Sequence, residues 1–186
     1  AGRAPFDVGL GEAAVHLFLF VHRVVGLDPG LYVFVRNDRD LGSLRQKGHS
    51  DFAWTQVEQA LPLYFLKAGD YRDAAPAASC HQDIAGDSAF SLSQLARFRE
   101  EVNEGPYHYR HLFWETGMVG QVLYLEAEAL GVRATGMGCF FDDPVHQLFG
   151  LHDDSFQSLY HFTVGGPVED PRLATLPAYH HLSVHA

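Results

Sequence analysis

Hydrophobic and small residues recur most regularly between Gly105 and Gly150. Gly105-Pro106 is a typical helix start, because proline at the first helical position needs no backbone N–H partner. After it, two parallel stripes follow at three- and four-residue spacing, formed by Leu112, Thr116, Val119, Leu123, Ala127 and Leu130 and by Phe113, Gly117, Gly120 and Tyr124. Gly131 is a typical helix stop. The pattern predicts one long helix buried on several sides, in the middle of a domain or at a subunit interface.

The residues that follow this helix predict a glycine turn and a second, short helix. Gly136-Met137-Gly138 reads as the turn, while Asp143 and Pro144 suit the cap and first residue of a helix that ends at Gly150. Gly117 and Gly120 within the long helix each cost about 1 kcal/mol relative to alanine. We therefore expect a backbone or a flat ligand to approach the helix closely there.

Strand patterns occur on both sides of this central unit. Residues 15–25 are β-branched and aromatic, a turn follows at 26–30, and 31–35 reads as the return strand of a hairpin. Residues 159–164 alternate like a strand. Residues 88–96 are ambiguous, because Ser91 with Gln94 would form a helix capping box, whereas Phe90, Leu92 and Gln94 alternate in strand fashion.

The remaining segments predict loops and short helices. Residues 37–50 are polar and charged, which favours a loop, and Asp51 could cap an amphipathic helix that Pro62 ends. Residues 70–84 are alanine-rich and predict a helix despite Pro76. Residues 180–186 predict a tail. Together the elements predict a single α+β domain over residues 1–186, with an antiparallel-type sheet around one long helix.

Composition and charge narrow the classes of function that this chain can have. The chain has 186 residues, 13 Lys and Arg against 23 Asp and Glu, and a formal net charge of −10 without a basic cluster, which argues against a nucleic-acid or anionic-membrane surface. No apolar run is long enough to span a bilayer and no signal peptide is visible. The two cysteines, Cys80 and Cys139, predict free thiols and a cytoplasmic protein. Cys139 reads as a buried inert thiol more readily than as a reactive one.

Simple catalytic and metal motifs are weak in this sequence. His108, His111 and Glu115 share a helix face at ligand-compatible spacing, but a polar helix start explains them better and we expect no metal. No G-x-S-x-G elbow or P-loop lysine motif occurs, and Gly136-Met137-Gly138 is too short for a dinucleotide fingerprint. Tyr107, Tyr109, Lys67 and Glu115 are possible general acids or bases, yet none stands out, so the catalytic residues are unknown.

The order of the motifs resembles the flavin-dependent nitroreductase superfamily. The segments that carry this resemblance are WETGMVGQ at 114–121, LYLEAEALG at 123–131, TGMGCF at 135–140, FDDPV at 141–145, Gly150-Leu151 and YHFTVGGP at 160–167. Upstream, residues 22–32 and SCHQDI at 79–84 look like the SagB/ThcOx-type dehydrogenase branch. The similarity covers residues 15–176.

This resemblance implies an α+β nitroreductase-like fold, a strand at 88–96, and a homodimer, or the partner domain of a tandem protein, built around the long helix. It implies FMN at the dimer interface, with the turn from Gly136 to Cys139 along the isoalloxazine ring. The cofactor-binding residues expected are Gly117, Gln121, Gly136, Met137, Gly138, Cys139 and Arg172. The glycines make physical sense because only a bare backbone approaches a flat ring this closely.

The implied activity is hydride transfer from NAD(P)H through the flavin to a small molecule, or oxidation of a peptide azoline in the SagB/ThcOx branch. The family's N-terminal phosphate anchor is expected upstream of this chain, which would therefore lack the usual N-terminal segment. The family's C-terminal Lys-x-Arg falls on Ala178-Tyr179-His180, with Arg172 the nearest cation. A phosphate dianion needs such donors. The alternative is a degenerate domain that keeps the fold for a structural or dimerisation role and binds no flavin.

Overall fold

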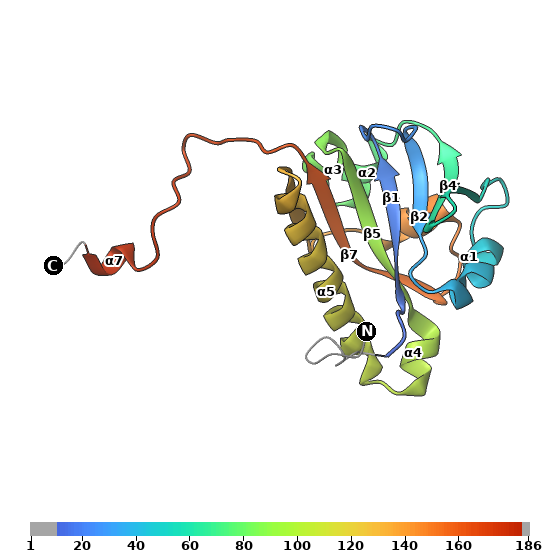
Figure 1. The fold of residues 1–186 in the computed structure, drawn as a ribbon. Coiled ribbons are helices and arrows are strands. Elements are labelled where there is room, and N and C mark those ends of the chain that lie inside the picture. The colour runs from blue at the N-terminus through green and yellow to red at the C-terminus, as the bar shows by residue number, and fades with distance from the viewer. Residues whose placement is uncertain (1–10, 184–186) are drawn as a thin grey trace.

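The protein is described by a computed structural model that covers residues 11–183. Its centre is a seven-stranded antiparallel sheet in the order β3-β4-β2-β1-β5-β7-β6, with helices on both faces (Figure 1). The strands are β1 (Val15–Val21), β2 (Gly30–Phe34), β3 (Thr55–Glu58), β4 (Leu61–Ala68), β5 (Phe90–Arg97), β6 (Arg133–Met137) and β7 (Phe156–Gly165). This architecture confirms the expected α+β class.

The predicted hairpin is confirmed as β1 and β2, which pair antiparallel with Leu19 opposite Tyr32. The first strand ends at Val21 rather than Val25. The backbone N–H groups of His22 and Arg23 both donate to Ala89 O, at 3.0 and 2.9 Å, so the chain leaves the ladder there.

Alternation along β1 divides the core between the two faces of the sheet. Phe18 and Phe20 point to one face, where Phe149 of α6 (Asp142–Phe149) packs with its ring centroid 3.8 Å from that of Phe18. Leu17 and Leu19 point to the other face. Phe162 and Val164 of β7 lie on that face too, beneath the long helix.

The long helix is confirmed as α5 (His108–Ala129). It packs closely on β7, since a β-carbon on Gly120 would lie 3.4 Å from the ring of Phe162. Its other side is open in the single chain: Met118, Val122 and Leu125 are 50%, 57% and 60% exposed. The expected burial on several sides is therefore not provided by this chain alone.

Two predictions for residues 37–62 are wrong. The expected loop contains a 3₁₀ turn (Asp38–Asp40) and α1 (Leu41–Lys47), because Leu44 is buried in the core and Asp40 is ion-paired with Arg97 at 2.6 Å. The expected helix after Asp51 is instead the hairpin of β3 and β4. Every residue of β3 is exposed, so only its pairing with β4 makes it a strand.

The region from 70 to 104 mixes short helices with one confirmed strand. The single helix predicted for 70–84 is replaced by α2 (Ala74–Ala78) and α3 (Ile84–Asp87), separated by Cys80 and His81 at φ +52° and +58°. β5 resolves the ambiguity at 88–96 in favour of a strand, and α4 (Phe98–Glu104) follows it.

The C-terminal part of the described chain contains α6, β7 and a short final helix. α6 closes at Gly150, which adopts φ +81° as a C-cap, and β7 confirms the strand expected at 159–164 while extending it at both ends. The segment after β7 runs away from the sheet to α7 (His180–Ser183) (Figure 1). Residues 184–186 of the expected tail lie outside the described residues. No helix between residues 11 and 183 is long and apolar enough to cross a bilayer.

Candidate functional site

The turn predicted at Gly136-Met137-Gly138 is wrong in part, because Gly136 and Met137 belong to the edge strand β6 and only Gly138 follows it. We refer to residues 138–140, which lead away from β6, as the turn. Met137, the last residue of β6, points into the core and is 2% exposed. Gly136 faces the opposite side, where its N–H donates to Tyr124 Oη of α5 at 2.8 Å. A β-carbon on Gly136 would lie only 2.6 Å from the Tyr160 hydroxyl oxygen. Gly136 is therefore required by the packing of Tyr160.

Gly138, directly after β6, has a different environment. It is exposed, and a β-carbon there would meet only Tyr160 Cε2, at 3.6 Å. Within the described part of the chain, neither its N–H nor its carbonyl has a hydrogen-bond partner. The turn thus presents an unpaired backbone edge that an external ligand can contact.

This backbone edge lines a groove of about 590 Å³. Half of the lining residues are aromatic, and the full set is Phe98, Tyr109, Phe113, Gly138, Phe140, Asp142, Gln157, Ser158, Leu159 and Tyr160. Ligand sites commonly have volumes of about 300–1,000 Å³ and mostly apolar walls with a few polar groups. The groove therefore has the size and wall chemistry that a flat aromatic ligand requires.

One end of the groove is polar. Burial raises the pKa of Asp142, although nearby His146 and a hydrogen bond with Gln157 act in the opposite direction. Burial lowers the pKa of His146, and its Nε2 accepts a hydrogen bond from the Ser158 N–H at 3.2 Å, so the ring is neutral. Asp142 is thus a carboxyl group whose proton is held more firmly than usual, which suits proton exchange with a ligand.

The long helix contributes a second face to this region. Phe113, Gly117, Gln121 and Tyr124 follow one another at helical spacing. Phe113 lines the groove and Tyr124 holds Gly136. Gly117 and Gln121 lie between them and are exposed, and Gly117 has open space where a β-carbon would be.

The structure therefore brings some of the expected cofactor residues to one region and separates others from it. Gly117, Gln121, Gly136 and Gly138 belong to the α5–β6 side. The side chain of Met137 fills the core, and that of Cys139 points toward α2 and α3.

Arg172 lies apart, in the segment that leaves the sheet, where it forms an ion pair with Asp170 at 2.7 Å. No Lys or Arg lines the groove among residues 11–183. The ring end of an FMN molecule fits the donor and wall chemistry found here, because Gly138 offers a bare backbone between aromatic side chains. The described lining of the groove offers no cation to the phosphate end.

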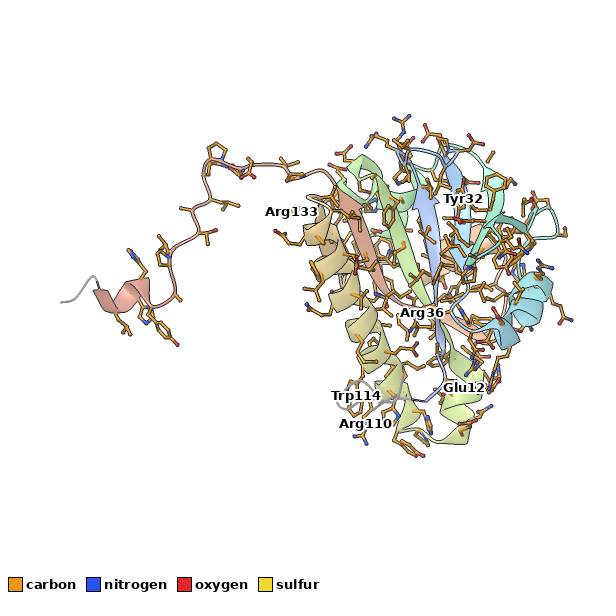
Figure 2. All side chains as sticks on the ribbon, viewed as in Figure 1. Glu12, Tyr32, Arg36, Arg110, Trp114 and Arg133 are labelled. Carbon is orange, nitrogen blue, oxygen red and sulfur yellow. A yellow bond between two sulfur atoms is a disulfide. The ribbon has the colours of Figure 1, made fainter. Side chains whose placement is uncertain are left out.

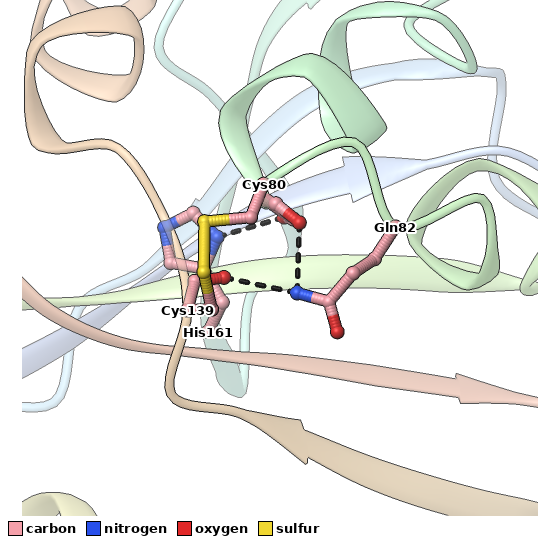
Figure 3. The surroundings of a disulfide bond; sticks show 5 residues. Cys80, Gln82, Cys139 and His161 are labelled. Atoms are coloured by element: carbon pink, nitrogen blue, oxygen red, sulfur yellow. Dashed lines mark hydrogen bonds between the residues drawn. A yellow bond between two sulfur atoms is a disulfide. The ribbon is translucent and has the colours of Figure 1, made fainter.

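The prediction that Cys80 and Cys139 are free thiols is wrong. Cys80 and Cys139 form a disulfide with a Cα–Cα distance of 5.7 Å, rather than two free thiols (Figure 3). Cys139 is exposed rather than buried. The partners are 59 residues apart, so no local spacing in the sequence indicates the pair. A disulfide is uncommon in cytosolic proteins, and it removes the thiol argument for a cytoplasmic location.

A buried histidine beneath the turn was not singled out by the sequence. His161 of β7 stacks on Phe140 with ring centroids 4.6 Å apart, and its Nδ1 lies 2.9 Å from Ser79 Oγ. Burial lowers the pKa of His161 to about 3. Only the folded chain brings these residues together, because Ser79 and His161 are 82 positions apart.

The other candidates for chemistry have structural partners. The Glu115 carboxylate accepts from the N–H groups of Ala14 and Val15 at 3.1 and 3.3 Å and pairs with Arg36, which Figure 2 shows at the lower end of the sheet. It therefore holds the start of β1 instead of joining His108 and His111 as a ligand set. Lys67 pairs with Asp51 at 2.6 Å. Tyr109 alone among the proposed acids and bases lines the groove.

Comparison with known proteins shows which family and which solved structures this chain resembles. Residues 95–166 match the sequence model of the nitroreductase family. A nitroreductase structure from Anabaena variabilis superposes with a TM-score of 0.64 at 22% identity, covering 83% of this chain and 27% of that one. A nitroreductase structure from Ralstonia eutropha gives 0.59 at 15% identity, covering 87% and 62%.

A third similar structure is the Escherichia coli microcin synthetase McbBCD complex with truncated pro-MccB17 bound, with a TM-score of 0.54 at 18% identity, covering 84% of this chain and 53% of that one. This chain thus spans between 27% and 62% of the length of these neighbours. No curated protein sequence matches it. The chain has the nitroreductase-like fold, and its stretch from the end of β5 through β7 carries the sequence pattern of the nitroreductase family.

Proposed function

We propose that this chain is the flavin-ring half of an FMN-dependent oxidoreductase. The observation that carries the proposal is Gly138, whose unpaired backbone edge lies in a groove walled by aromatic side chains. Bound FMN would supply two-electron hydride chemistry. The match of residues 95–166 to the nitroreductase family supports this assignment, because the turn and groove fall almost entirely within that stretch.

The residues of this chain would bind and shield the ring and manage one proton. The Gly138 N–H would donate to a ring acceptor, and Phe113 and Phe140 would exclude water from the reacting face. Asp142 at the polar end would exchange a proton with the substrate, and burial raises the pKa of its carboxyl group.

We further propose that the functional unit is a homodimer. Trp114, Met118, Val122 and Leu125 form an exposed apolar stripe along α5 at helical spacing. Trp114 lies at its lower end with the Arg110 guanidinium 5.7 Å from its ring (Figure 2). Contiguous exposed apolar residues on one helix face are typical of an interaction site. The second chain, or sequence beyond this one, would supply the cations for the phosphate.

The resemblance implies two substrate classes to compare: NAD(P)H with a small acceptor, and a peptide azoline. The E. coli neighbour is a synthetase complex with a truncated precursor bound, which makes an azoline peptide a reasonable second substrate to test. The negative net charge of this chain and the absence of a cation from the described groove lining favour a neutral substrate over an anionic one.

FMN titration of the purified protein tests the proposal. Quenching of flavin fluorescence should saturate for the wild type and be lost in Gly138→Val, whose branched side chain would occupy the space above Tyr160. Gly166→Val is the control, because it adds the same side chain at a position where a β-carbon meets no atom within 4 Å and that lies outside the groove lining. Equal FMN affinity in wild type and Gly138→Val would remove the turn from the site. A protein that takes up neither FMN nor riboflavin would instead support the purely structural role.

A further inference from the structure

We propose that the Cys80–Cys139 disulfide is a reversible thiol–disulfide exchange site that locks the turn carrying Gly138. In this proposal a dithiol reductant opens the bond, the turn is released, and flavin affinity falls. The last of these consequences rests on the proposed FMN site, whereas the exchange and the release of the turn do not.

The bond is accessible to a reductant. Cys139 is exposed and Cys80 is partly exposed, at the surface between β6 and α2. Structural disulfides are typically resistant to reduction, while exposed or strained ones are the labile and regulatory ones. An incoming thiolate can therefore approach the sulfur of Cys139 without unfolding the domain.

The disulfide is the covalent part of a clamp between the turn and the segment after α2. The side-chain amide of Gln82 donates to Cys139 O at 2.9 Å and to Ser79 O at 2.8 Å (Figure 3). The N–H of Phe141 donates to Ala78 O at 2.8 Å. The hydrogen bonds of Cys139 O and Phe141 N–H join residues 139–141 to residues 78–82, so they depend on both segments keeping their present conformation.

One side of the clamp has an unfavourable backbone. Cys80 and His81 are consecutive residues with a β-carbon, yet both adopt positive φ, at +52° and +58°. Such residues visit this region rarely and usually singly, and they persist there only where surrounding contacts impose it. Cleavage of the disulfide removes one of those contacts at Cys80 itself, which allows the segment to relax and to withdraw Gln82.

The released turn has few other restraints on the groove side. Met137 is anchored in the core, but Gly138 has no hydrogen bond within the described residues, and a β-carbon there would meet only Tyr160. Displacement of Cys139 therefore moves the backbone of Gly138 directly. Phe140, which lines the groove and stacks on His161, shifts with the same segment.

The atoms and electrons of this exchange balance with the dithiol as the only other reactant. One thiolate of the dithiol attacks Cys139 Sγ, the bond to Cys80 breaks, and Cys80 leaves as a thiolate that takes up a proton. The second thiol of the reductant then attacks the mixed disulfide and expels Cys139. The protein gains two electrons and two protons, and the dithiol becomes a disulfide.

Dithiothreitol treatment of the full chain tests the exchange. Alkylation followed by mass analysis counts the free thiols. We expect two added alkyl groups after reduction and none after reoxidation. Deuterium uptake of backbone amides in residues 136–142 should become about tenfold faster on reduction, while uptake in β1 stays unchanged. The variant Cys80→Ser/Cys139→Ser should show the fast uptake permanently and not respond to the reductant.

FMN affinity is then measured on the oxidised, reduced and double-serine forms. We expect the dissociation constant to rise about tenfold in the last two forms, in parallel with the amide exchange. A disulfide that resists dithiothreitol in the folded protein, or reduction that changes neither uptake nor affinity, would overturn the proposal. If no form binds FMN, the proposed oxidoreductase function fails, and the deuterium uptake alone decides whether the disulfide locks the turn.

Discussion

The hydroxyl oxygen of Tyr160 lies 2.6 Å from the place where a β-carbon on Gly136 would stand. On β7 the residue opposite Gly136 is Phe162, and Tyr160 is its diagonal neighbour, so a side chain at 136 would displace the Tyr160 ring that lines the groove. We expect Gly136→Ala to destabilise the protein by about 1–3 kcal/mol, in the range of overpacked sites. Gly138→Ala is the matched control, since its β-carbon would make an ordinary contact at 3.6 Å. Urea unfolding of both variants measures the difference, and equal stability would contradict the packing role of Gly136.

Glu115 should be important for stability rather than for catalysis. Its carboxylate is 7% exposed and is bonded to the start of β1 and to Arg36, so its removal leaves buried donors without an acceptor. We expect Glu115→Ala to cost about 3 kcal/mol in the free energy of unfolding. Glu128→Ala on the same helix removes an exposed pair with Arg133 and should cost less than about 1 kcal/mol. Similar losses in both variants would show that burial does not distinguish the two pairs.

His161 should make the protein less stable as the pH falls. Its pKa is about 3 in the folded protein and 6.5 in the unfolded chain, so below pH 6.5 the unfolded state binds more protons. The contribution of the neutral His161 ring to the free energy of unfolding is complete above pH 6.5. It falls by up to about 1.4 kcal/mol per pH unit as the pH decreases toward 3.

Burial also lowers the pKa values of His22 and His146, which add to the same slope. Urea unfolding between pH 4.5 and 7 should therefore show a shallower slope for His161→Gln, by about one proton. Identical slopes in the wild type and in His161→Gln would mean that burial does not hold the His161 ring neutral.

The apolar stripe on α5 predicts an oligomer that a charge can disrupt. Val122→Glu would place a carboxylate in the middle of the proposed contact, so we expect the dimer to dissociate at least about a hundredfold more readily. Val25→Glu makes the same substitution at a fully exposed loop position and should leave the dimer intact. Sedimentation velocity measures both. A wild-type protein that is monomeric at high concentration would exclude the dimer.

The parts of the fold that the sequence predicted are those with local, repeated patterns. The spacing of apolar residues in α5 and the β1–β2 hairpin depend on neighbours within a few positions. β3 could not be predicted, because its residues are all exposed and its conformation comes from pairing with β4. The turn at Gly138 was expected through its resemblance to a family. Its surroundings, from Phe98 to the Cys80 bond, join segments that are far apart in the chain.

The alternation of β6 continues into the turn, so successive residues there meet different environments. Met137 enters the core, Gly138 opens onto the groove, and Cys139 turns toward the disulfide on the far side. Each position is therefore subject to a separate constraint, although they are covalent neighbours. In the proposed site, a side chain added at Gly138 would enter the groove, whereas a different side chain at Met137 would alter the core. Substitutions at these two adjacent positions would therefore separate effects on the ligand from effects on stability.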